Sequence, residues 1–573
     1  MPTISFHPND LLPLLAGVGA KKSAPVTPAQ IESLLTLVKG EFKGQDSETG
    51  EWRVELQDSN RPDLWCSEGI ARQLRIKKQG KAEAYPFFAS KKSPTRQVRV
   101  AKGMDRVRPY VAACAAIGYA VTESGLAQLI QTQEKLADIF GRKRKTVSIG
   151  VYRLPAIQFP VTYDLVAPDA VSFTPLGMDT AMTPAEILMV HPKGLEYGSI
   201  VSGQERLPIL RDKKGQVLSF PPIINSREIG EVRIGDCDLF VEVTGTDLAM
   251  VVLALNIFAV NLADRGARIE PVEIHYPYKT DMGTRVQAPR DFGKARTIPL
   301  AAIESALGES ISVDEVRRTL RAYGYTVSGS GKTVTVKLPP YRNDLMHAVD
   351  VVEDVAICRG YETFAPVMPQ QFTVGSLSRL EERSDQVRDL MVGIGYQEVI
   401  SNILGSRQDY VERMQTEGSP WGTLVEVDNV MSLNYACLRP SIIPSLLRVE
   451  AASGRAFYPH RLFEAGEVAR LDPTHVNGSS TRLSLAVLAV HAAVTFSEMH
   501  SALDLLMYYL GHAYELKPVA HPSFLEGRAG EIIVAGQVRG TIGELHPGAL
   551  EQWQITVPAA AFELDLTDLP DAD

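Results

Sequence analysis

The chain has 573 residues, of which 45% are hydrophobic and 22% are charged, and its formal net charge is −9. This composition predicts a well-packed protein of several domains and argues against a nucleic-acid-binding protein that is basic over its whole surface. The five cysteines form no CxxC pair, which argues against a zinc site or a disulfide framework and favours a reducing cytoplasm. No signal peptide is expected, because no basic region precedes the first apolar run.

Residues 1–95 form the first predicted domain, an α+β unit. A strand is expected at Thr3–Phe6, and helical patterns occur at Ala29–Val38 and Ser67–Arg75. The next segment, Lys91–Arg108, is basic and interrupted by proline, which predicts a connector and a domain boundary.

Residues 96–285 form the second predicted domain, in which strands and helices alternate as in an α+β fold. Its most apolar stretch, Leu248–Ala263, is short for a membrane span and is interrupted by Asn256 and Asn261. We therefore expect a buried helix there and no membrane association. The other predicted elements are strands at 112–116, 147–151 and 239–243 and a helix at 125–140.

Two strand patterns in this domain carry polar residues of interest. Leu207–Arg211 and Val217–Phe220 flank a Lys-Gly turn, which predicts a hairpin. Further on, Glu242 and Thr244 share one face of a strand, because side chains alternate with a period of two. If that face lines a cavity, the carboxylate and the hydroxyl could orient a hydroxylated substrate and a water. Spacing alone favours the alternative, an exposed strand face followed by a glycine turn.

The basic run Gly141–Lys145 ends a predicted helix. Cations suit the negative end of a helix dipole, and they can also contact phosphate. Taken alone, the run is better interpreted as a solvated helix end, because charge runs usually are solvated. The chain has no G-x-x-x-x-G-K-[ST] phosphate loop and no G-x-S-x-G nucleophile elbow.

The third predicted domain, residues 290–366, ends in an acidic segment. Pro339 and Pro340 end the preceding strand, and a helical pattern begins at about Leu345. Three like charges at helical spacing repel one another unless a cation neutralises them, and Mg²⁺ prefers carboxylate oxygens. The alternative is a solvated acidic first turn that favours the helix dipole, and spacing alone does not separate the two. The acidic residues are Asp344, Asp350, Glu353 and Asp354.

Residues 370–573 form the fourth predicted domain, a larger antiparallel α+β unit. No repeat of fixed period appears in the chain, and no segment offers an obvious nucleophile. The elements predicted in this domain are helices at 380–393, 441–452 and 496–510 and strands at 483–490, 531–534 and 562–566.

A series of short motifs runs along nearly the whole chain. They are Asn60–Leu64 with Glu68–Gly69, Gly141–Arg144, His191–Gly194, Pro221–Asn225, Val243–Asp247, the acidic segment, Arg461–Glu464, His521–Phe524 and Ile542–Pro547. No single motif is decisive, but their order and spacing resemble the β-subunit family of phenylalanyl-tRNA synthetases in its archaeal and eukaryotic form. The resemblance implies a multidomain α+β chain with a central B3/B4-like editing domain, a small B5-like α/β domain and a C-terminal domain like a class II synthetase.

The resemblance also implies a cytoplasmic heterotetramer of two α and two β subunits. This complex joins phenylalanine to tRNA(Phe), and the α subunit binds the ATP. In this family the acidic segment binds Mg²⁺ together with the α subunit. That property would assign the metal to the B5-like domain and to Asp344, Asp350, Glu353 and Asp354.

The central domain of this family hydrolyses tyrosine that has been attached to tRNA(Phe) in error. A second site is needed because a pocket for an aromatic ring does not strongly reject an added hydroxyl. The matching positions are Leu210, Ser219, Glu242 and Thr244. By resemblance, Glu242 would recognise tyrosine or orient a water, and Ser219 and Thr244 would position the substrate. Relatives carry either Asp or Glu at the position of Glu242.

The last domain resembles a class II synthetase core that has lost its chemistry. Arg461–Glu464 is similar to the class II motif that pairs an arginine with a glutamate, but Gly540–Glu544 lacks the arginine of an ATP-binding motif. We therefore expect this domain to support a catalytic α subunit. Two alternatives are a freestanding hydrolase that clears mischarged tRNA, against which the extended C-terminal domain argues, and a scaffold module with an inactive editing site.

Overall fold

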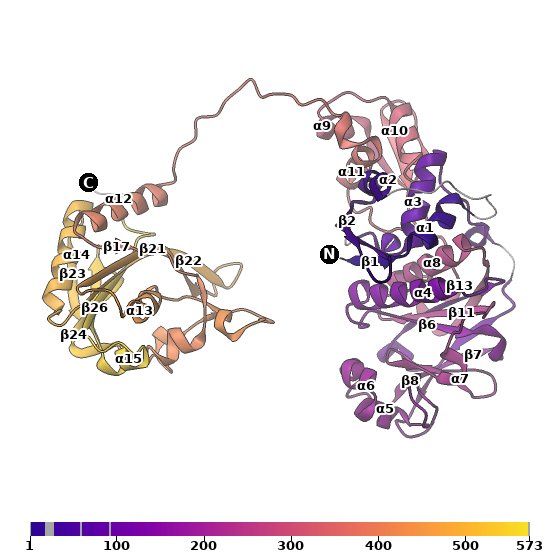
Figure 1. The fold of residues 1–573 in the computed structure, drawn as a ribbon, viewed down its shortest axis with the longest axis horizontal. Coiled ribbons are helices and arrows are strands. Elements are labelled where there is room, and N and C mark those ends of the chain that lie inside the picture. Colours follow the sequence, from indigo (N-terminus) through magenta and orange to yellow (C-terminus); the bar gives the residue numbers. More distant parts are fainter. Residues whose placement is uncertain (1, 18–27, 58–59, 91–92, 571–573) are drawn as a thin grey trace. The chain divides into compact units, whose positions relative to one another are not determined.

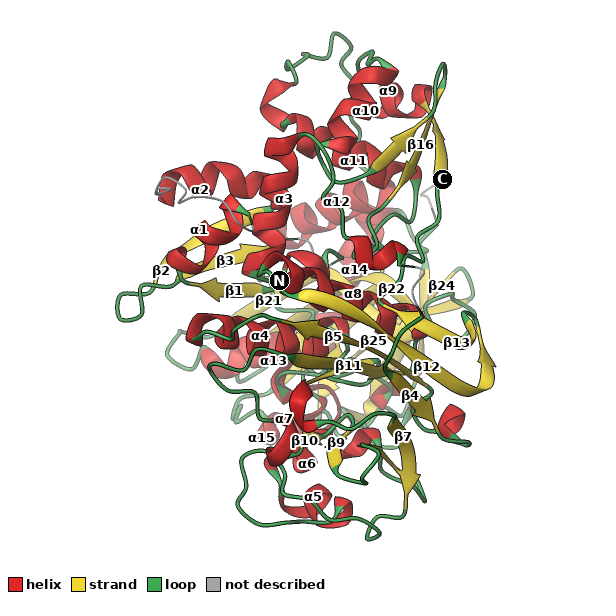
Figure 2. Ribbon diagram, turned by 90° about the vertical axis from the view of Figure 1, so that its right-hand side faces the viewer, coloured by secondary structure: helices red, strands yellow, loops and turns green. Residues whose placement is uncertain are grey.

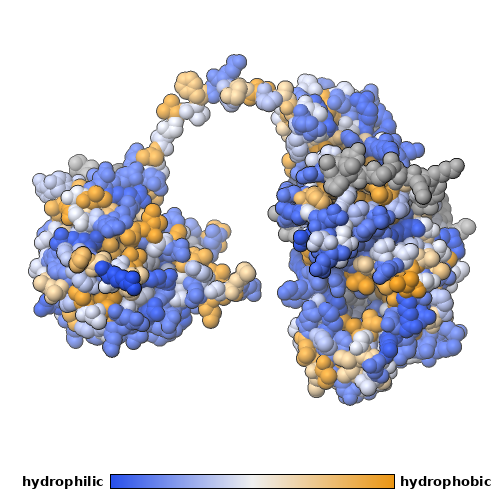
Figure 3. All heavy atoms as spheres, in the orientation of Figure 1, coloured by the Kyte–Doolittle hydropathy of each residue, from blue (hydrophilic) through white to orange (hydrophobic). Residues whose placement is uncertain are grey.

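Figure 1 shows the computed structural model of the chain, which describes residues 2–17, 28–57, 60–90 and 93–570. The chain forms two compact units, Met1–Val367 and Met368–Asp573. Within the described ranges, no helix is both long and apolar enough to cross a membrane. Residues 365–378 contain no helix or strand, and apolar side chains are exposed along them (Figure 3).

The first unit begins with a small antiparallel sheet of strand order β1–β3–β2. These strands are β1 (Thr3–Phe6), β2 (Gly40–Gln45) and β3 (Trp52–Leu56), and the helices beside them are α1 (Pro8–Ala16), α2 (Pro28–Leu35) and α3 (Ser67–Gln79). The predicted strand and both predicted helices are therefore confirmed. Helix α3 is joined to the rest of the unit by a buried ion pair, in which Arg72 Nε lies 2.8 Å from Asp264 Oδ2.

A ten-stranded sheet dominates the unit, with the order β10–β9–β8–β7–β4–β12–β5–β11–β6 and with β13 beside β12. Its strands are β4 (Gln97–Val100), β5 (Tyr110–Ile117), β6 (Val147–Arg153), β7 (Val161–Val166), β8 (Leu207–Arg211), β9 (Val217–Phe220), β10 (Ile224–Asn225), β11 (Leu239–Gly245), β12 (Arg268–Thr280) and β13 (Gly283–Ala288). Strand β4 corrects the expectation for Lys91–Arg108, because it pairs in parallel with β7 and β12. From Gln97 onward this segment belongs to the sheet; Lys91 lies outside the described residues.

Two helices cover one face of β5, β11 and β6 (Figure 1): α4 (Glu123–Lys135) and α8 (Leu248–Asp264). Helix α8 is buried along nearly its whole length, as its apolar sequence predicts. The predicted helix at 125–140 is α4 followed by a π-helical turn at Leu136–Phe140. Every residue of β11 is buried, so the expectation of an exposed strand face around Glu242 is wrong. The face away from α8 packs against apolar side chains of β8 and β9.

Strands β8 and β9 form the predicted hairpin, with Leu210 opposite Ser219. Its turn is held by Asp212, whose Oδ1 accepts hydrogen bonds from the backbone N–H groups of Lys214 at 2.8 Å and Gln216 at 3.0 Å. Short polar side chains that bond the backbone two residues on are typical of turns.

The last part of the first unit is a three-stranded sheet of order β14–β16–β15 with three helices beside it (Figure 2). Its elements are β14 (Arg296–Pro299), α9 (Leu300–Leu307), α10 (Val313–Arg321), β15 (Thr326–Ser328), β16 (Thr333–Lys337) and α11 (Ala348–Arg359). The acidic helix α11 begins three residues later than predicted. Asp350 Oδ2 accepts the backbone N–H groups of Met346 and His347, both at 2.6 Å, and this cap fixes the start of the helix.

The second unit is built on a seven-stranded sheet of order β17–β21–β22–β26–β25–β24–β23. All its pairs are antiparallel except β17 with β21. Its elements are α12 (Arg379–Gly393), β17 (Gln397–Glu398), α13 (Ile443–Ala452), β21 (His460–Leu471), β22 (Ser479–Val490), α14 (Phe496–Leu510), β23 (Tyr514–Pro518), β24 (Phe524–Val534), β25 (Gln537–Leu545), α15 (Pro547–Gln552) and β26 (Ala559–Asp565). The predicted helices and strands of this region are all present, and the predicted antiparallel α+β arrangement is confirmed.

Candidate functional site

The four residues predicted for tyrosine editing lie on the face of the large sheet away from α8, and all four are buried. Strand pairing explains why: Glu242 lies opposite Gly150 of β6 and Thr244 opposite Ser148. Residues that alternate along paired strands share one face. Leu210 belongs to the apolar cluster on that same face.

Tyr152 joins two of the predicted residues. Its Oη lies 2.8 Å from Glu242 Oε1 and 2.8 Å from Ser219 Oγ. Thr244 is held separately, because its Oγ1 lies 2.9 Å from Ser148 Oγ and accepts a hydrogen bond from Arg108 Nε at 3.1 Å. We call these six side chains the buried polar cluster: Arg108, Ser148, Tyr152, Ser219, Glu242 and Thr244.

Arg108 is the cation of the buried polar cluster, and it touches no carboxylate among the described residues. Its Nη2 donates to the carbonyl oxygen of Thr244 at 2.8 Å and to Ser148 Oγ at 3.1 Å, and its Nη1 donates to the carbonyl oxygen of Lys145 at 3.1 Å. Burial lowers the pKa of this guanidinium, although the charge of Glu242 opposes the effect.

Glu242 is the anion of the cluster. Burial raises its pKa to about 7, against the hydrogen bond from Tyr152 and the charge of Arg108, which both lower it. Oε1 is bonded to Tyr152, and Oε2 is buried with no hydrogen-bond partner among the described residues. Burial also raises the pKa of Tyr152 well above its ordinary value, so its phenol stays protonated and can donate. A carboxyl group that titrates near neutrality and has one unused oxygen can bind a hydroxyl or a water.

The basic run Gly141–Lys145 adjoins the cluster through the Lys145 carbonyl. The backbone is left-handed at three consecutive residues, Arg142, Lys143 and Arg144, whose φ values are 51°, 53° and 63°. This conformation costs on the order of 1 kcal/mol for each residue. Arg144 donates to the carbonyl oxygens of Pro222 and Ile223 and lies 4.2 Å from the ring centre of Tyr197. Arg142, Lys143 and Lys145 are exposed, as the solvated interpretation predicted, whereas Arg144 is half-buried.

The four predicted metal ligands do not come together. Arg342 Nη2 lies 2.6 Å from Asp344 Oδ2 and 2.7 Å from Asp354 Oδ2, so one buried guanidinium neutralises both carboxylates. Asp350 caps α11, and Glu353 Oε1 is 2.7 Å from Lys39 Nζ. Burial would raise the pKa of Asp344, but the charge and hydrogen bonds of Arg342 lower it to about 2.

This arrangement does not fit a magnesium site formed by all four carboxylates. Among the described residues, no group of three or more His, Cys, Asp or Glu side chains is placed to hold a metal ion. The physical reason is local: Arg342, two positions before Asp344, supplies the positive charge that the sequence analysis attributed to a metal. Its place in the same segment was the signal that could have indicated this.

Three comparisons with known proteins agree. Family models named "Phenylalanyl tRNA synthetase beta chain CLM domain" and "tRNA synthetase B5 domain" match residues 365–566 and 296–361. The phenylalanine–tRNA ligase beta subunit of Borrelia recurrentis is 36% identical over 573 residues, covering 99% of this chain and 100% of its own length. That of Treponema pallidum is 39% identical over 521 residues, covering 90% and 86%. The chain belongs to the phenylalanyl-tRNA synthetase β-subunit family.

A solved structure supports this membership for the fold. The crystal structure of an N-terminal fragment of the phenylalanyl-tRNA synthetase beta subunit from Pyrococcus horikoshii is 33% identical, with a TM-score of 0.58. The alignment covers 63% of this chain and 100% of that fragment. The mixed α+β, multidomain architecture expected for the family is therefore confirmed.

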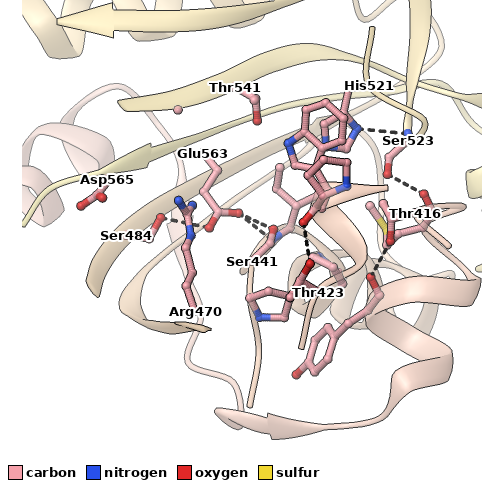
Figure 4. A pocket seen from close by; sticks show the side chains of 18 of the residues that line it. Thr416, Thr423, Ser441, Arg470, Ser484, His521, Ser523, Thr541, Glu563 and Asp565 are labelled. Atoms are coloured by element: carbon pink, nitrogen blue, oxygen red, sulfur yellow. Dashed lines mark hydrogen bonds between the residues drawn. The ribbon is translucent and has the colours of Figure 1, made fainter. Parts of the chain in front are cut away.

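The second unit contains a cavity of about 450 Å³ on the face of its sheet (Figure 4). Glu563 points into it, but the carboxylate is already used: Oε2 accepts from Ser441 Oγ at 2.5 Å and from the backbone N–H of Ile442 at 3.0 Å, and Oε1 accepts from Ser484 Oγ at 3.0 Å. These bonds hold the start of α13, which explains why this helix begins after Ser441. Burial lowers the pKa of His521 in the same cavity to about 4, so its imidazole is neutral at pH 7.

The arginine and the glutamate of the Arg461–Glu464 motif each contact another residue. Arg461 Nη2 lies 3.0 Å from Glu498 Oε1, and Glu464 Oε1 lies 2.7 Å from Arg439 Nη1.

Three members of the buried polar cluster, Arg108, Ser148 and Tyr152, were not predicted from the sequence. Ser148 lies in the strand predicted at 147–151 and Tyr152 just beyond it. The contact of Tyr152 with Glu242 depends on the pairing of β6 with β11, which joins residues 90 positions apart. Arg108 fell in a segment interpreted as a connector. Nothing in the sequence around it indicated that it would be buried.

Proposed function

We propose that this chain is the β subunit of a phenylalanine–tRNA ligase (EC 6.1.1.20), which attaches phenylalanine to tRNA(Phe) using ATP. The names of its full-length relatives support both the activity and the α-subunit partner. The complex would be a cytoplasmic heterotetramer of two α and two β subunits. We place the synthetic step, the ATP and the accompanying Mg²⁺ on the α subunit, and we assign none of this chain's residues to that step.

We further propose that the second unit is a catalytically inactive, class II-like platform for the α subunit. The use of the Glu563 carboxylate to hold α13, rather than to face the cavity freely, supports this. The proposed domains are residues 1–95, an editing domain at 96–285, a B5-like domain at 290–366 and the platform at 370–573. The two family models support the last two ranges.

The chain also fits the archaeal and eukaryotic type of this family. The full-length alignment of the Pyrococcus horikoshii fragment supports this grouping. The grouping concerns the architecture and not the source organism, because the relatives named above are bacterial.

The buried polar cluster is the proposed site that removes tyrosine from tRNA(Phe). The observation that carries this proposal is that Glu242 and Ser219 together bind a phenol, that of Tyr152. A site that pairs its buried polar groups with a substrate hydroxyl rejects the analogue that lacks it, because those groups are then left unpaired. Tyrosine would be retained on this basis and phenylalanine rejected.

The reaction is hydrolysis of an ester. Water adds to the carbonyl carbon, the bond from that carbon to the ribose oxygen breaks, the ribose oxygen takes a proton, and tyrosine leaves as the free amino acid. Glu242 would accept a hydrogen bond from the phenol of tyrosine, and Ser219 would form a hydrogen bond with the phenol oxygen. Leu210 would contact the ring, and Thr244, held by Arg108 and Ser148, would position the substrate.

The exposed side chains of Arg142 and Lys143 are the proposed contact for the tRNA backbone next to this site. Phosphates are bound mainly by such cations, without sequence preference. The support is their position, since the same turn touches the buried polar cluster through Lys145 and Arg108.

The assembled complex is the material for the test. We expect ATP-dependent charging only when this chain and the α subunit are present together. We also expect the complex to hydrolyse tyrosyl-tRNA(Phe) and Glu242→Ala to lower kcat/KM of that hydrolysis by about a hundredfold or more without changing charging. The matched control is Glu228→Ala, which removes an exposed carboxylate from the same domain.

Each alternative gives a different result. Hydrolysis of tyrosyl-tRNA(Phe) by a chain that never associates with an α subunit would favour a freestanding hydrolase. A complex that charges tRNA but does not hydrolyse the mischarged product would favour a scaffold with an inactive editing site. Hydrolysis at the normal rate by Glu242→Ala would place the editing site elsewhere.

A further inference from the structure

Tyr152 holds a phenol between the two groups that would recognise the phenol of a substrate. Its hydroxyl is the donor toward both Glu242 Oε1 and Ser219 Oγ, each at 2.8 Å, and its single proton serves one of the two at a time. The ring lies against Phe240, with 6.0 Å between ring centres. The side chain of Tyr152 is fully buried.

The neighbouring backbone leaves room for this phenol. A Cβ atom on Gly150 would lie 2.1 Å from Tyr152 Oη and 2.6 Å from Glu242 Oε1, which is closer than real contacts allow. Any larger residue at this position would expel the phenol or shift the carboxylate. The chain thus contains a phenol-shaped space that ends at Glu242 and Ser219, and its own side chain fills that space.

We propose that Tyr152 is an internal ligand of the editing site, which the tyrosyl group of the substrate displaces, and that it sets how readily any aminoacyl group enters. The inference rests on the proposed function of the buried polar cluster. In this proposal Tyr152 competes with the substrate, whereas Glu242 and Ser219 bind the substrate.

The exchange has a definite thermodynamic consequence. Displacing Tyr152 breaks its bonds to Glu242 and Ser219, and a tyrosyl group restores both bonds. A phenylalanyl group restores neither and leaves two buried polar groups unpaired. This difference belongs to the bound states and is set by Glu242 and Ser219. The free energy needed to displace Tyr152 is the same whichever aminoacyl group enters, so it lowers kcat/KM for both groups by the same factor.

Tyr152 therefore controls the absolute rate and not the selectivity. This control protects the correct product, since phenylalanyl-tRNA enters only after the site gives up a fully bonded internal phenol. If Tyr152 were instead a fixed wall that contacts the bound substrate, its hydroxyl would contribute to the bound state, and removing it would change the selectivity.

The test uses the assembled complex with Tyr152→Phe, which keeps the ring and removes both hydrogen bonds. We expect kcat/KM for tyrosyl-tRNA(Phe) and for phenylalanyl-tRNA(Phe) to rise together, by roughly tenfold, through a lower KM, with their ratio unchanged within twofold. Tyr152→Ala should raise both further if it folds. The matched control is Tyr163→Phe, which removes a buried phenol hydroxyl from the same apolar cluster; that hydroxyl has no hydrogen-bond partner among the described residues.

A fall in both constants, or a change of more than twofold in their ratio, would overturn the proposal for Tyr152. If the complex hydrolyses neither substrate, with the natural chain or with a Tyr152 variant, the proposed editing function fails. A binding measurement then tests whether Tyr152 is an internal ligand. The full chain without the α subunit is then titrated with L-tyrosinamide and L-phenylalaninamide by calorimetry. Tighter binding of both by Tyr152→Phe supports the internal ligand, and unchanged or weaker binding overturns it.

Discussion

Two of the places where the first unit buries carboxylates solve the same electrostatic problem differently. Around Arg342, one guanidinium contacts Asp344 and Asp354 directly. Around Glu242, the nearest cation, Arg108, is turned toward hydroxyl and carbonyl oxygens instead. The pKa of Asp344 is consequently lowered, by the charge of Arg342 against the effect of burial, to about 2, whereas burial raises the pKa of Glu242 to about 7.

This difference separates structural from chemical use of a buried charge. Both carboxylate oxygens of Asp344 are bonded to Arg342 and its pKa is low, so it is ionised at physiological pH and has no oxygen to offer. Burial raises the pKa of Asp354, although the charge of the same arginine lowers it. A carboxyl group without such a partner titrates near neutrality and can bind or exchange a proton, which is the usual property of functional groups. By this criterion Asp344 makes a structural contact, and Glu242 is the candidate for chemistry.

The largest expected effect comes from removing Arg342, the cation that contacts Asp344 and Asp354. Arg342→Met removes the cation that contacts the buried Asp344 and Asp354, and we expect the free energy of unfolding of the first unit to fall by about 3–5 kcal/mol. Denaturant unfolding measures this loss. Arg233→Met is the control, because it removes an exposed ion pair and should change stability by less than about 1 kcal/mol.

A second variant makes this comparison sharper. Replacing both aspartates by asparagine in the Arg342→Met background removes the uncompensated charges and should recover much of the lost stability. A loss below about 1 kcal/mol in the single variant would mean that Arg342 does not neutralise these carboxylates.

The next effect concerns Glu242 and the pH dependence of the free energy of unfolding. The pKa of Glu242 is about 7 in the folded chain, against 4.5 for an ordinary glutamate. The folded state therefore holds its proton more tightly, and the stability this gives is present below pH 4.5 and is lost as the pH rises to 7 and above. A shift of this size corresponds to about 3 kcal/mol.

Glu242→Gln cannot ionise and lacks this dependence. Its stability relative to the natural chain should rise by about 3 kcal/mol between pH 4 and pH 8, because other groups titrate equally in both proteins and cancel. Thermal unfolding across this pH range measures the difference. A difference that stays constant with pH would show that Glu242 does not titrate near neutrality.

Local sequence patterns predicted the elements well where one physical cause dominates. The apolar run at 248–263 has a single stable placement, across the sheet as α8, and the helix at 496–510 was predicted to the residue. The prediction was less accurate where a distant or capping side chain sets the boundary. Asp350 delays the start of α11, and Glu563, more than a hundred residues away, fixes the start of α13.

The candidate site divides in the same way. Resemblance to the family located Leu210, Ser219, Glu242 and Thr244, but nothing local indicated that Tyr152 joins two of them. That contact depends on the register between β6 and β11, which side-chain periodicity does not determine. In the acidic segment, helical spacing grouped the carboxylates but gave no sign that Arg342 contacts Asp344 and Asp354 or that Lys39 contacts Glu353.

The smallest expected effect concerns the exposed cations beside the buried polar cluster. If Arg142 and Lys143 contact tRNA phosphates, replacing both with alanine should reduce the slope of log affinity against log salt by roughly 1.5, at about 0.7–0.9 for each contact. Affinity near 0.1 M salt should fall by about tenfold. Binding of tRNA to the complex, measured by filter binding at several salt concentrations, tests this.

The control is Lys294→Ala with Lys332→Ala, which removes the same charge from exposed positions on another part of the first unit. Equal slopes for the two double variants would exclude a specific contact at Arg142 and Lys143. The turn itself should keep its conformation, because the carbonyl bonds and the Tyr197 contact that anchor it belong to Arg144. Because Arg144 stays in place, the variant loses charge while the turn keeps its shape.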